Sequence, residues 1–150
     1  MILEIVTSFL FGFILVSLLD FLLFIGLKIN YFNTYNIGEY FNVIFVDNQN
    51  VWLIVALSFL FGYLMLYSKL SKFFDTFYII LLILFASTLY EPIGKRVGEE
   101  IFREKNKIFE VSGTKFRGDL LYEGRSYYYI KRDEIKSAIR LSKEDVKIVK

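Results

Sequence analysis

The sequence predicts an integral membrane protein with about three transmembrane helices, followed by a small all-β barrel domain at the carboxyl terminus. Two observations predict this fold class. Hydrophobic residues make up 55% of the 150-residue chain. The charges gather at one end, because residues 1–90 carry three bases and five acids whereas residues 91–150 carry 15 bases and 11 acids. Residues 1–90 therefore have the composition of a membrane-embedded segment, and residues 91–150 have that of a water-soluble domain.

The first predicted span covers residues 5–27, which is long enough at about 1.5 Å per residue to cross a hydrocarbon layer of about 30 Å. A second span covers residues 51–67 and a third covers residues 74–91. The third has an uncharged core of only about 15 residues, near the lower limit for crossing. A two-span hairpin is therefore the alternative. Together these segments define a transmembrane domain over residues 1–92.

A connector over residues 28–50 joins the first two spans. It is rich in asparagine and in aromatic residues, a composition typical of the headgroup boundary. Its apolar piece, residues 40–46, is too short to cross. We expect an interfacial or shallow re-entrant segment. Its aromatic residues are Tyr31, Phe32, Tyr35, Tyr40, Phe41 and Phe45.

Basic residues near the span ends predict the orientation. Two of them, Lys69 and Lys72, follow the second span. A larger group shares the opposite side of a three-span arrangement, namely Lys28, Lys95, Arg96, Arg103, Lys105 and Lys107. The positive-inside rule then places the carboxy-terminal domain in the cytoplasm. The predicted location is the cytoplasmic (inner) membrane of a bacterium.

Beyond Pro92 the pattern changes twice. Residues 93–107 mix both charges with apolar residues and predict a juxtamembrane amphipathic helix. Residues 108–150 form the predicted β domain, where apolar and polar residues alternate. The expected strands cover residues 107–112, 115–122, 126–132, 137–141 and 146–149, with Ser112-Gly113 and Glu123-Gly124 as turns.

The end of the chain carries a resemblance. A strand at residues 138–141 is followed by one helical turn at residues 142–145 and a last strand at residues 146–149. This order resembles the closing strands of Src-homology-3-like barrels, and an OB-like barrel fits nearly as well. The resemblance covers about 12 residues and implies an architecture, not a biological role.

Asp20 is the most informative single residue, because an acid inside a span is costly and usually faces a helix, a cavity or a partner charge. The three predicted spans contain no Lys or Arg that could neutralise it. Three interpretations follow. Asp20 hydrogen-bonds a hydroxyl group and fixes helix packing, it contacts another membrane subunit, or it belongs to a proton or ion relay.

The stretch Ser-Phe-Leu-Phe-Gly occurs twice, at Ser8 to Gly12 and at Ser58 to Gly62. Each copy places two small residues four apart on one helix face, which lets backbones approach closely. We expect these faces to pack against each other or against a partner.

Two further groups are candidate contact residues. Lys95 and Arg96 follow the third span, where bases attract anionic lipid headgroups. On the predicted third strand Tyr127, Tyr129 and Lys131 share one face. With Tyr122 they are predicted to dock a protein partner, although the strand propensity of tyrosine alone explains the pattern more simply.

The chain contains no cysteine and no histidine, which removes the commonest metal ligands and the commonest general base. It also lacks a Gly-rich phosphate loop and a nucleophile elbow. We therefore predict no catalytic, cofactor or metal site. The weakly basic β domain predicts no nucleic-acid partner.

The predicted function is that of a non-enzymatic accessory or assembly protein. Its spans would pack against subunits of a larger membrane complex while its β domain docks a protein partner. Membrane lipids, other integral membrane subunits and a second copy of the chain are the expected partners. The alternative is a homo-oligomeric transport or channel protein in which Asp20 lines a polar path.

Overall fold

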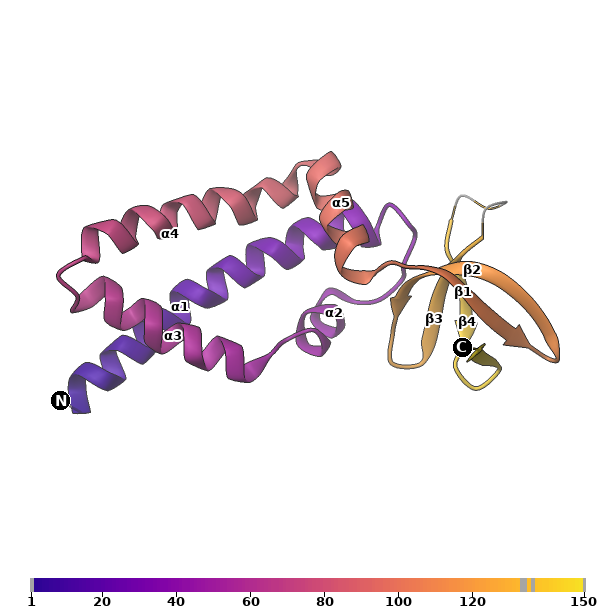
Figure 1. Cartoon of the computed structure of the whole chain (residues 1–150), viewed down its shortest axis with the longest axis horizontal. Helices are drawn as coiled ribbons and strands as arrows, with labels where there is room; N and C mark the ends of the chain where they lie inside the picture. The colour runs from indigo at the N-terminus through magenta and orange to yellow at the C-terminus, as the bar shows by residue number, and fades with distance from the viewer. Residues whose placement is uncertain (1, 133–134, 136, 150) are drawn as a thin grey trace.

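The computed structural model describes residues 2–132, 135 and 137–149, and shows helices followed by a single sheet (Figure 1). The helical part consists of α1 (Ile2–Leu27), a π-helical turn η1 (Lys28–Phe32), α2 (Phe41–Asp47), α3 (Val51–Leu66), α4 (Ser71–Ala86), a 3-10 turn η2 (Ser87–Leu89) and α5 (Glu91–Phe102). The strands are β1 (Glu104–Val111), β2 (Thr114–Glu123), β3 (Tyr127–Lys131), β4 (Ile139–Ser142) and β5 (Val146–Val149).

The apolar helices agree closely with the predicted spans. The continuous helix Ile2–Phe32 and the segment Ser71–Leu89 are each long and apolar enough to cross a membrane. The helices α2 and α3 meet this standard only as a pair, and they are bent by 79° at the break between them. The described residues thus contain two candidate spans, or three if the bent pair counts as one. Whether α3 crosses by itself remains a prediction, since its 16 residues cover about 24 Å.

The apolar helices run along the long axis of the molecule, and α1 lies obliquely between α4 and α3 (Figure 1). The amino terminus and the α3–α4 turn lie at one end, and the sheet lies at the other. This arrangement matches the sidedness expected of three spans, because chain direction reverses from α1 to α3 and again from α3 to α4.

The five strands form one antiparallel sheet in the order β4-β3-β2-β1-β5. They lie close to the predicted positions, and the last two strands are joined by a hydrogen-bonded turn at residues 143–145, where one helical turn was predicted. The tight turn between β1 and β2 uses Ser112 and Gly113 at φ 49° and 82°. Positive φ at both central residues is the hairpin geometry that matches the twist of the flanking strands.

The predicted barrel is wrong, because β4 and β5 form two open edges and do not pair with each other in the described residues. One face of the sheet buries its own small core of Phe109, Leu120, Ile130 and Val146. The other face is covered by a different part of the chain. The second face of the sheet is therefore buried by another segment of the chain, so its burial does not require closure into a barrel.

That neighbour is the connector over residues 28–50. Its side chains share one core with the ends of the helices and with the sheet, made of Phe24, Leu27, Tyr31, Phe32, Tyr35, Ile37, Ile44, Leu121, Tyr122 and Tyr129. Tyr31, Phe32 and Ile44 are fully buried. Most of the aromatic rings of the connector thus pack against protein, and the position of the connector relative to a membrane stays a prediction. The exposed Tyr40 is an exception.

Candidate functional site

The small-residue faces of α1 and α3 pack against each other. Ser8 and Ser58 are buried at 3% and 0% exposure. A Cβ atom added at Gly12 would overlap the backbone carbonyl of Ser58, and one added at Gly62 would overlap that of Ser8. The antiparallel crossing therefore pairs each glycine with the serine of the other helix. Both faces are used inside the chain and are not free for a partner.

Polar contacts attach α4 to α1. The Tyr78 hydroxyl donates to the carbonyl oxygen of Leu15 at 2.9 Å. Near the other end of α4, the buried Thr88 lies against Gly26, where an added Cβ would overlap the threonine side chain. The Asn30 amide donates to the Thr88 carbonyl oxygen at 2.8 Å. These contacts hold η2, directly after α4, against the end of α1 and against η1.

Asp20 borders a cavity of about 320 Å³ between α1, α2 and α3. Its walls are mainly apolar, and its polar members are Ser17, Asp20 and Gln49. Gln49 is the side chain that interacts with the Asp20 carboxylate. Its Nε2 atom is buried and makes no hydrogen bond of normal geometry with any described residue. The cavity thus holds an acid and an amide that face each other beside apolar walls.

Asp20 faces the break between α2 and α3, where Asp47, Asn48, Gln49 and Asn50 form a continuous polar run. Trp52, one turn into α3, is 83% exposed. Tryptophan is typical of the headgroup boundary. Asp20 lies in the half of α1 that is nearer the sheet.

One of the three interpretations of Asp20 paired it with a hydroxyl group, and none of them named Gln49. The available signal was the polar run directly before the second span. A residue at the start of an antiparallel helix comes close to the far end of its neighbour. The length of the connector concealed this proximity.

The junction between helices and sheet is the second candidate site. The Tyr31 hydroxyl donates to the carbonyl oxygen of Leu121 at 2.8 Å in the buried core. The Tyr35 hydroxyl donates to the Glu99 carboxylate of α5. The backbone N–H of Ala138 donates to the Tyr35 carbonyl oxygen at 3.1 Å. The connector is thereby bonded to α5 and to the sheet at once.

Further along the connector, charged groups continue these contacts. The Arg125 guanidinium donates to both carboxylate oxygens of Asp47, at 2.7 and 2.5 Å. The Tyr129 hydroxyl donates to Glu39 at 3.2 Å. The Asn48 amide donates to the Tyr122 hydroxyl at 3.3 Å. The polar residues of the connector therefore fix the sheet in one position relative to the helices.

These contacts change the interpretation of the predicted docking face. Tyr122 and Tyr129 are 4% and 2% exposed, because the connector covers them. Tyr127 remains partly exposed beneath the Arg140 guanidinium, which lies 3.6 Å from its ring centroid. Lys131 also remains partly exposed. The tyrosines do form a docking surface, but its occupant is the connector of the same chain.

Burial and nearby acids perturb the tyrosines of the junction. Burial, with a hydrogen bond to Glu99, raises the pKa of Tyr35 to about 12. Burial and the nearby Glu39 raise the pKa of Tyr129 to about 12. Both phenols are therefore held protonated as hydrogen-bond donors. This is the state their carboxylate partners require.

An ion pair links α5 to the sheet just beyond the junction. Arg103 donates to the Asp119 carboxylate at 2.6 and 3.0 Å and lies 3.5 Å from Glu99. Partial burial of Asp119 opposes ionisation, yet the backbone N–H of Asn106 and the Arg103 guanidinium keep its pKa below the usual value. These two carboxylates therefore already have partners.

The predicted headgroup residues lie on different sides of α5. Gly94 and Gly98 pack against η1, and a Cβ at Gly98 would overlap the Tyr31 ring. The Lys95 Nζ atom lies 5.5 Å from the centroid of the Tyr35 ring, whereas Arg96 is exposed to solvent.

Within the part of the chain that the structure describes, no group of three or more potential metal-ligating side chains converges. Comparison with known protein families, with curated proteins and with solved structures gives no match.

Proposed function

We propose that this chain is a non-enzymatic accessory or assembly protein of a bacterial inner membrane, and that it contacts a helix of another membrane subunit at the Asp20 cavity. The observation that carries the proposal is an acid that faces an amide in a cavity whose walls are otherwise apolar and partly exposed. Polar groups in such a setting usually face a partner. A side chain from a neighbouring helix would supply one.

The exposure of the cavity walls supports a contact within the membrane. Phe13 and Val46, which line the cavity, are 45% and 60% exposed. The opening therefore faces the surroundings of the helices and not their packed interior. The Ser8–Gly62 crossing is already filled, which leaves the cavity as the better candidate for association.

The sheet has a more limited part in this proposal. Two of the four predicted docking residues, Tyr122 and Tyr129, are buried by the connector. A contact with a cytoplasmic part of the complex would use Tyr127 and Lys131, which remain partly exposed. The bases near the sheet end, among them Lys95 and Arg96, favour a cytoplasmic position by the positive-inside rule.

Site-specific photocrosslinking tests the helix contact. A photoreactive amino acid at Val46, beside the cavity, should form an adduct with an integral membrane protein in cells. The same residue at Ile83, which is 67% exposed on α4, should not form that adduct. Asp20→Leu should abolish the Val46 adduct, while the matched change Asp75→Leu on the exposed surface of α4 should preserve it. A Val46 adduct that persists in Asp20→Leu contradicts the proposal.

The alternative transport function predicts a different result. A homo-oligomer would give a Val46 adduct of two copies of the chain, and liposomes would show ion flux that Asp20→Asn abolishes. The apolar walls on both sides of Asp20 favour the accessory function, because one chain provides no continuous polar path in its described residues.

A further inference from the structure

Helix α5 buries its glycines and leaves apolar side chains exposed. Gly94 and Gly98 pack against η1, whereas Ile93 and Ile101 are 39% and 53% exposed. Val97, midway between the two isoleucines, is partly exposed. The spacing of four residues places the three side chains in one stripe along the helix. A helix of a folded protein normally turns such a stripe to the core, so the stripe on α5 indicates contact with something outside this chain.

The stripe lies on the side of α5 that faces the apolar helices. Beside it is a cavity of about 270 Å³. The two hydroxyl groups in its wall already have partners, because Ser87 and Thr88 donate to the carbonyl oxygens of Leu84 and Phe85 at 2.6 and 2.7 Å. The cavity is therefore suited to an apolar occupant. Its apolar wall comes from α5, α4 and α1, namely from Ile93, Val97, Leu84, Phe85 and Leu23.

The direction of α5 differs from that of the apolar helices. Figure 1 shows that α5 runs across the ends of α1 and α4 and not along them. It packs against η1, η2 and α1. Only Tyr90 separates α5 from the candidate span Ser71–Leu89. If the apolar helices cross a membrane, α5 therefore lies at the boundary of the bilayer and parallel to its plane.

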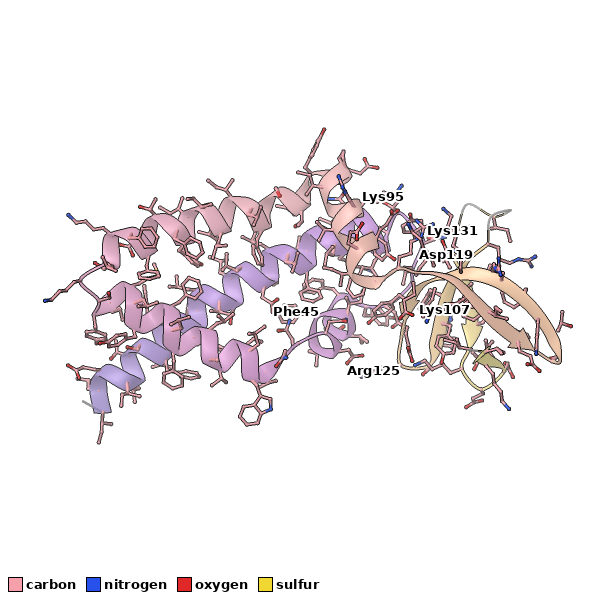
Figure 2. The ribbon with its side chains drawn as sticks, viewed as in Figure 1. Phe45, Lys95, Lys107, Asp119, Arg125 and Lys131 are labelled. Atoms are coloured by element: carbon pink, nitrogen blue, oxygen red, sulfur yellow. The ribbon has the colours of Figure 1, made fainter. Side chains whose placement is uncertain are left out.

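The polar residues of α5 lie on its other sides. Lys95, labelled in Figure 2, has its Nζ atom 5.5 Å from the centroid of the Tyr35 ring, and Glu99 accepts a hydrogen bond from the Tyr35 hydroxyl. Arg96 and Glu100 are exposed. An amphipathic helix of this kind lies in the membrane interface, with its apolar side about 5–10 Å below the headgroups.

We propose that α5 is an interfacial helix, and that the acyl chains of phospholipids cover the stripe Ile93, Val97 and Ile101 and enter the cavity beside α4. Continuity of the surface supports lipid as the occupant. The stripe extends the exposed apolar surface of α4, where Ile83 and Leu84 are 67% and 60% exposed. This inference rests on the proposed membrane location of the apolar helices, but it does not depend on a partner at the Asp20 cavity.

Depth-dependent fluorescence quenching of the full chain in lipid nanodiscs tests the proposal. Trp52 is the only tryptophan, so Trp52→Phe gives a dark background for single tryptophans at Tyr90 and Ile101. These positions lie at opposite ends of α5, about 16 Å apart along its axis. If α5 lies in the membrane plane, Tyr90→Trp and Ile101→Trp have the same depth. Both should lose fluorescence mainly to phospholipids that carry a nitroxide near the headgroup, and less to those that carry it near the acyl end.

Two control positions calibrate the depth. Ile83 lies about 9 Å before the end of the candidate span, so Ile83→Trp should be quenched mainly by the nitroxide near the acyl end. Lys147→Trp, at an exposed position on β5, should be quenched by neither lipid. Thermal unfolding identifies any variant that has lost its fold. Because the chain has no cysteine, a fluorophore on Ile101→Cys then gives the same measurement at that position.

Three results would overturn the proposal. Quenching of Tyr90→Trp without quenching of Ile101→Trp would mean that α5 leaves the membrane surface. Protection of both positions while Ile83→Trp is quenched would mean that water or protein covers the stripe. In both cases the membrane location of the apolar helices would stand, and this inference alone would fail. Absence of quenching at Ile83→Trp would overturn the membrane location together with this inference.

Discussion

At the scale of single residues, the tyrosines of the junction show how burial gives a residue its role. In the sequence Tyr122, Tyr127 and Tyr129 indicated an exposed aromatic face. Alternation along a strand indicates which residues share a face, but it does not indicate what covers that face. The covering residues come from the connector, about 90 positions earlier in the chain. No local sequence pattern indicates a contact between residues that are so far apart in the chain.

The raised pKa values of Tyr35 and Tyr129 predict loss of stability at alkaline pH. An unfolded tyrosine ionises near pH 10. A folded pKa of about 12 means that the fold favours the protonated phenol. The stabilisation is therefore complete below about pH 10 and is lost as the pH rises towards about 12. Thermal unfolding of the full chain in detergent between pH 8 and pH 12 should show this decrease.

A matched pair of variants attributes the decrease to the junction. Tyr129→Phe removes the phenol that donates to Glu39 and should make the decrease smaller. Tyr40→Phe removes a hydroxyl from an exposed side chain and serves as the control. An unchanged pH profile in Tyr129→Phe would show that its hydroxyl does not contribute to stability in this range.

At the scale of secondary-structure elements, the sequence predicted the helices and strands well and their assembly poorly. The length of the hydrophobic segments predicted the positions of α1 and α4. The alternation of apolar and polar residues predicted the positions of the five strands. The repeated pairs Ser8/Gly12 and Ser58/Gly62 indicated a close helix crossing, and the structure brings the two pairs together. The barrel was wrong because closure depends on what else can cover the sheet. Here the connector covers one face, and the strands at the two edges contain four residues each.

The α1–α3 crossing predicts a sharp cost for a single methyl group. Gly12→Ala should destabilise the chain by about 1–3 kcal/mol, because the added Cβ would overlap the Ser58 carbonyl and force the backbones apart. Gly38→Ala is the matched control, since nothing lies within 4 Å of the Cβ it adds. Thermal unfolding in detergent compares the two. Equal stability of both variants would mean that the helices do not approach as closely as described.

At the scale of the whole molecule, the connector packs against both the apolar helices and the sheet and so joins two parts of different composition. The apolar helices and the sheet share the core around Tyr31 and Leu121. An exposed bidentate pair, Asp47–Arg125, adds a contact of modest energy at the edge of this core. The buried rings contribute more, because each removes a large apolar surface from solvent. A partner helix at the Asp20 cavity would therefore contact the same packed unit that carries the sheet.

The sequence could not reveal this union, because composition divides the chain at about residue 92 and predicts two separate domains. The aromatic residues of the connector were assigned to the headgroup boundary, since amphipathic rings are favourable both there and in a protein core. The contact between Tyr31 and the sheet shows that this ring lies in a protein core. It joins residues 90 positions apart.

The most direct test of this account is the distance between the helices and the sheet in the full chain. The sequence contains no cysteine, so Cys substitutions at the exposed positions Ile83 on α4 and Lys147 on β5 give one unique pair of spin labels. Pulsed electron paramagnetic resonance in lipid nanodiscs should show a single narrow distance distribution, as expected for one rigid body. A broad distribution would show that the sheet moves independently on a flexible tether, and it would contradict the shared core at the connector.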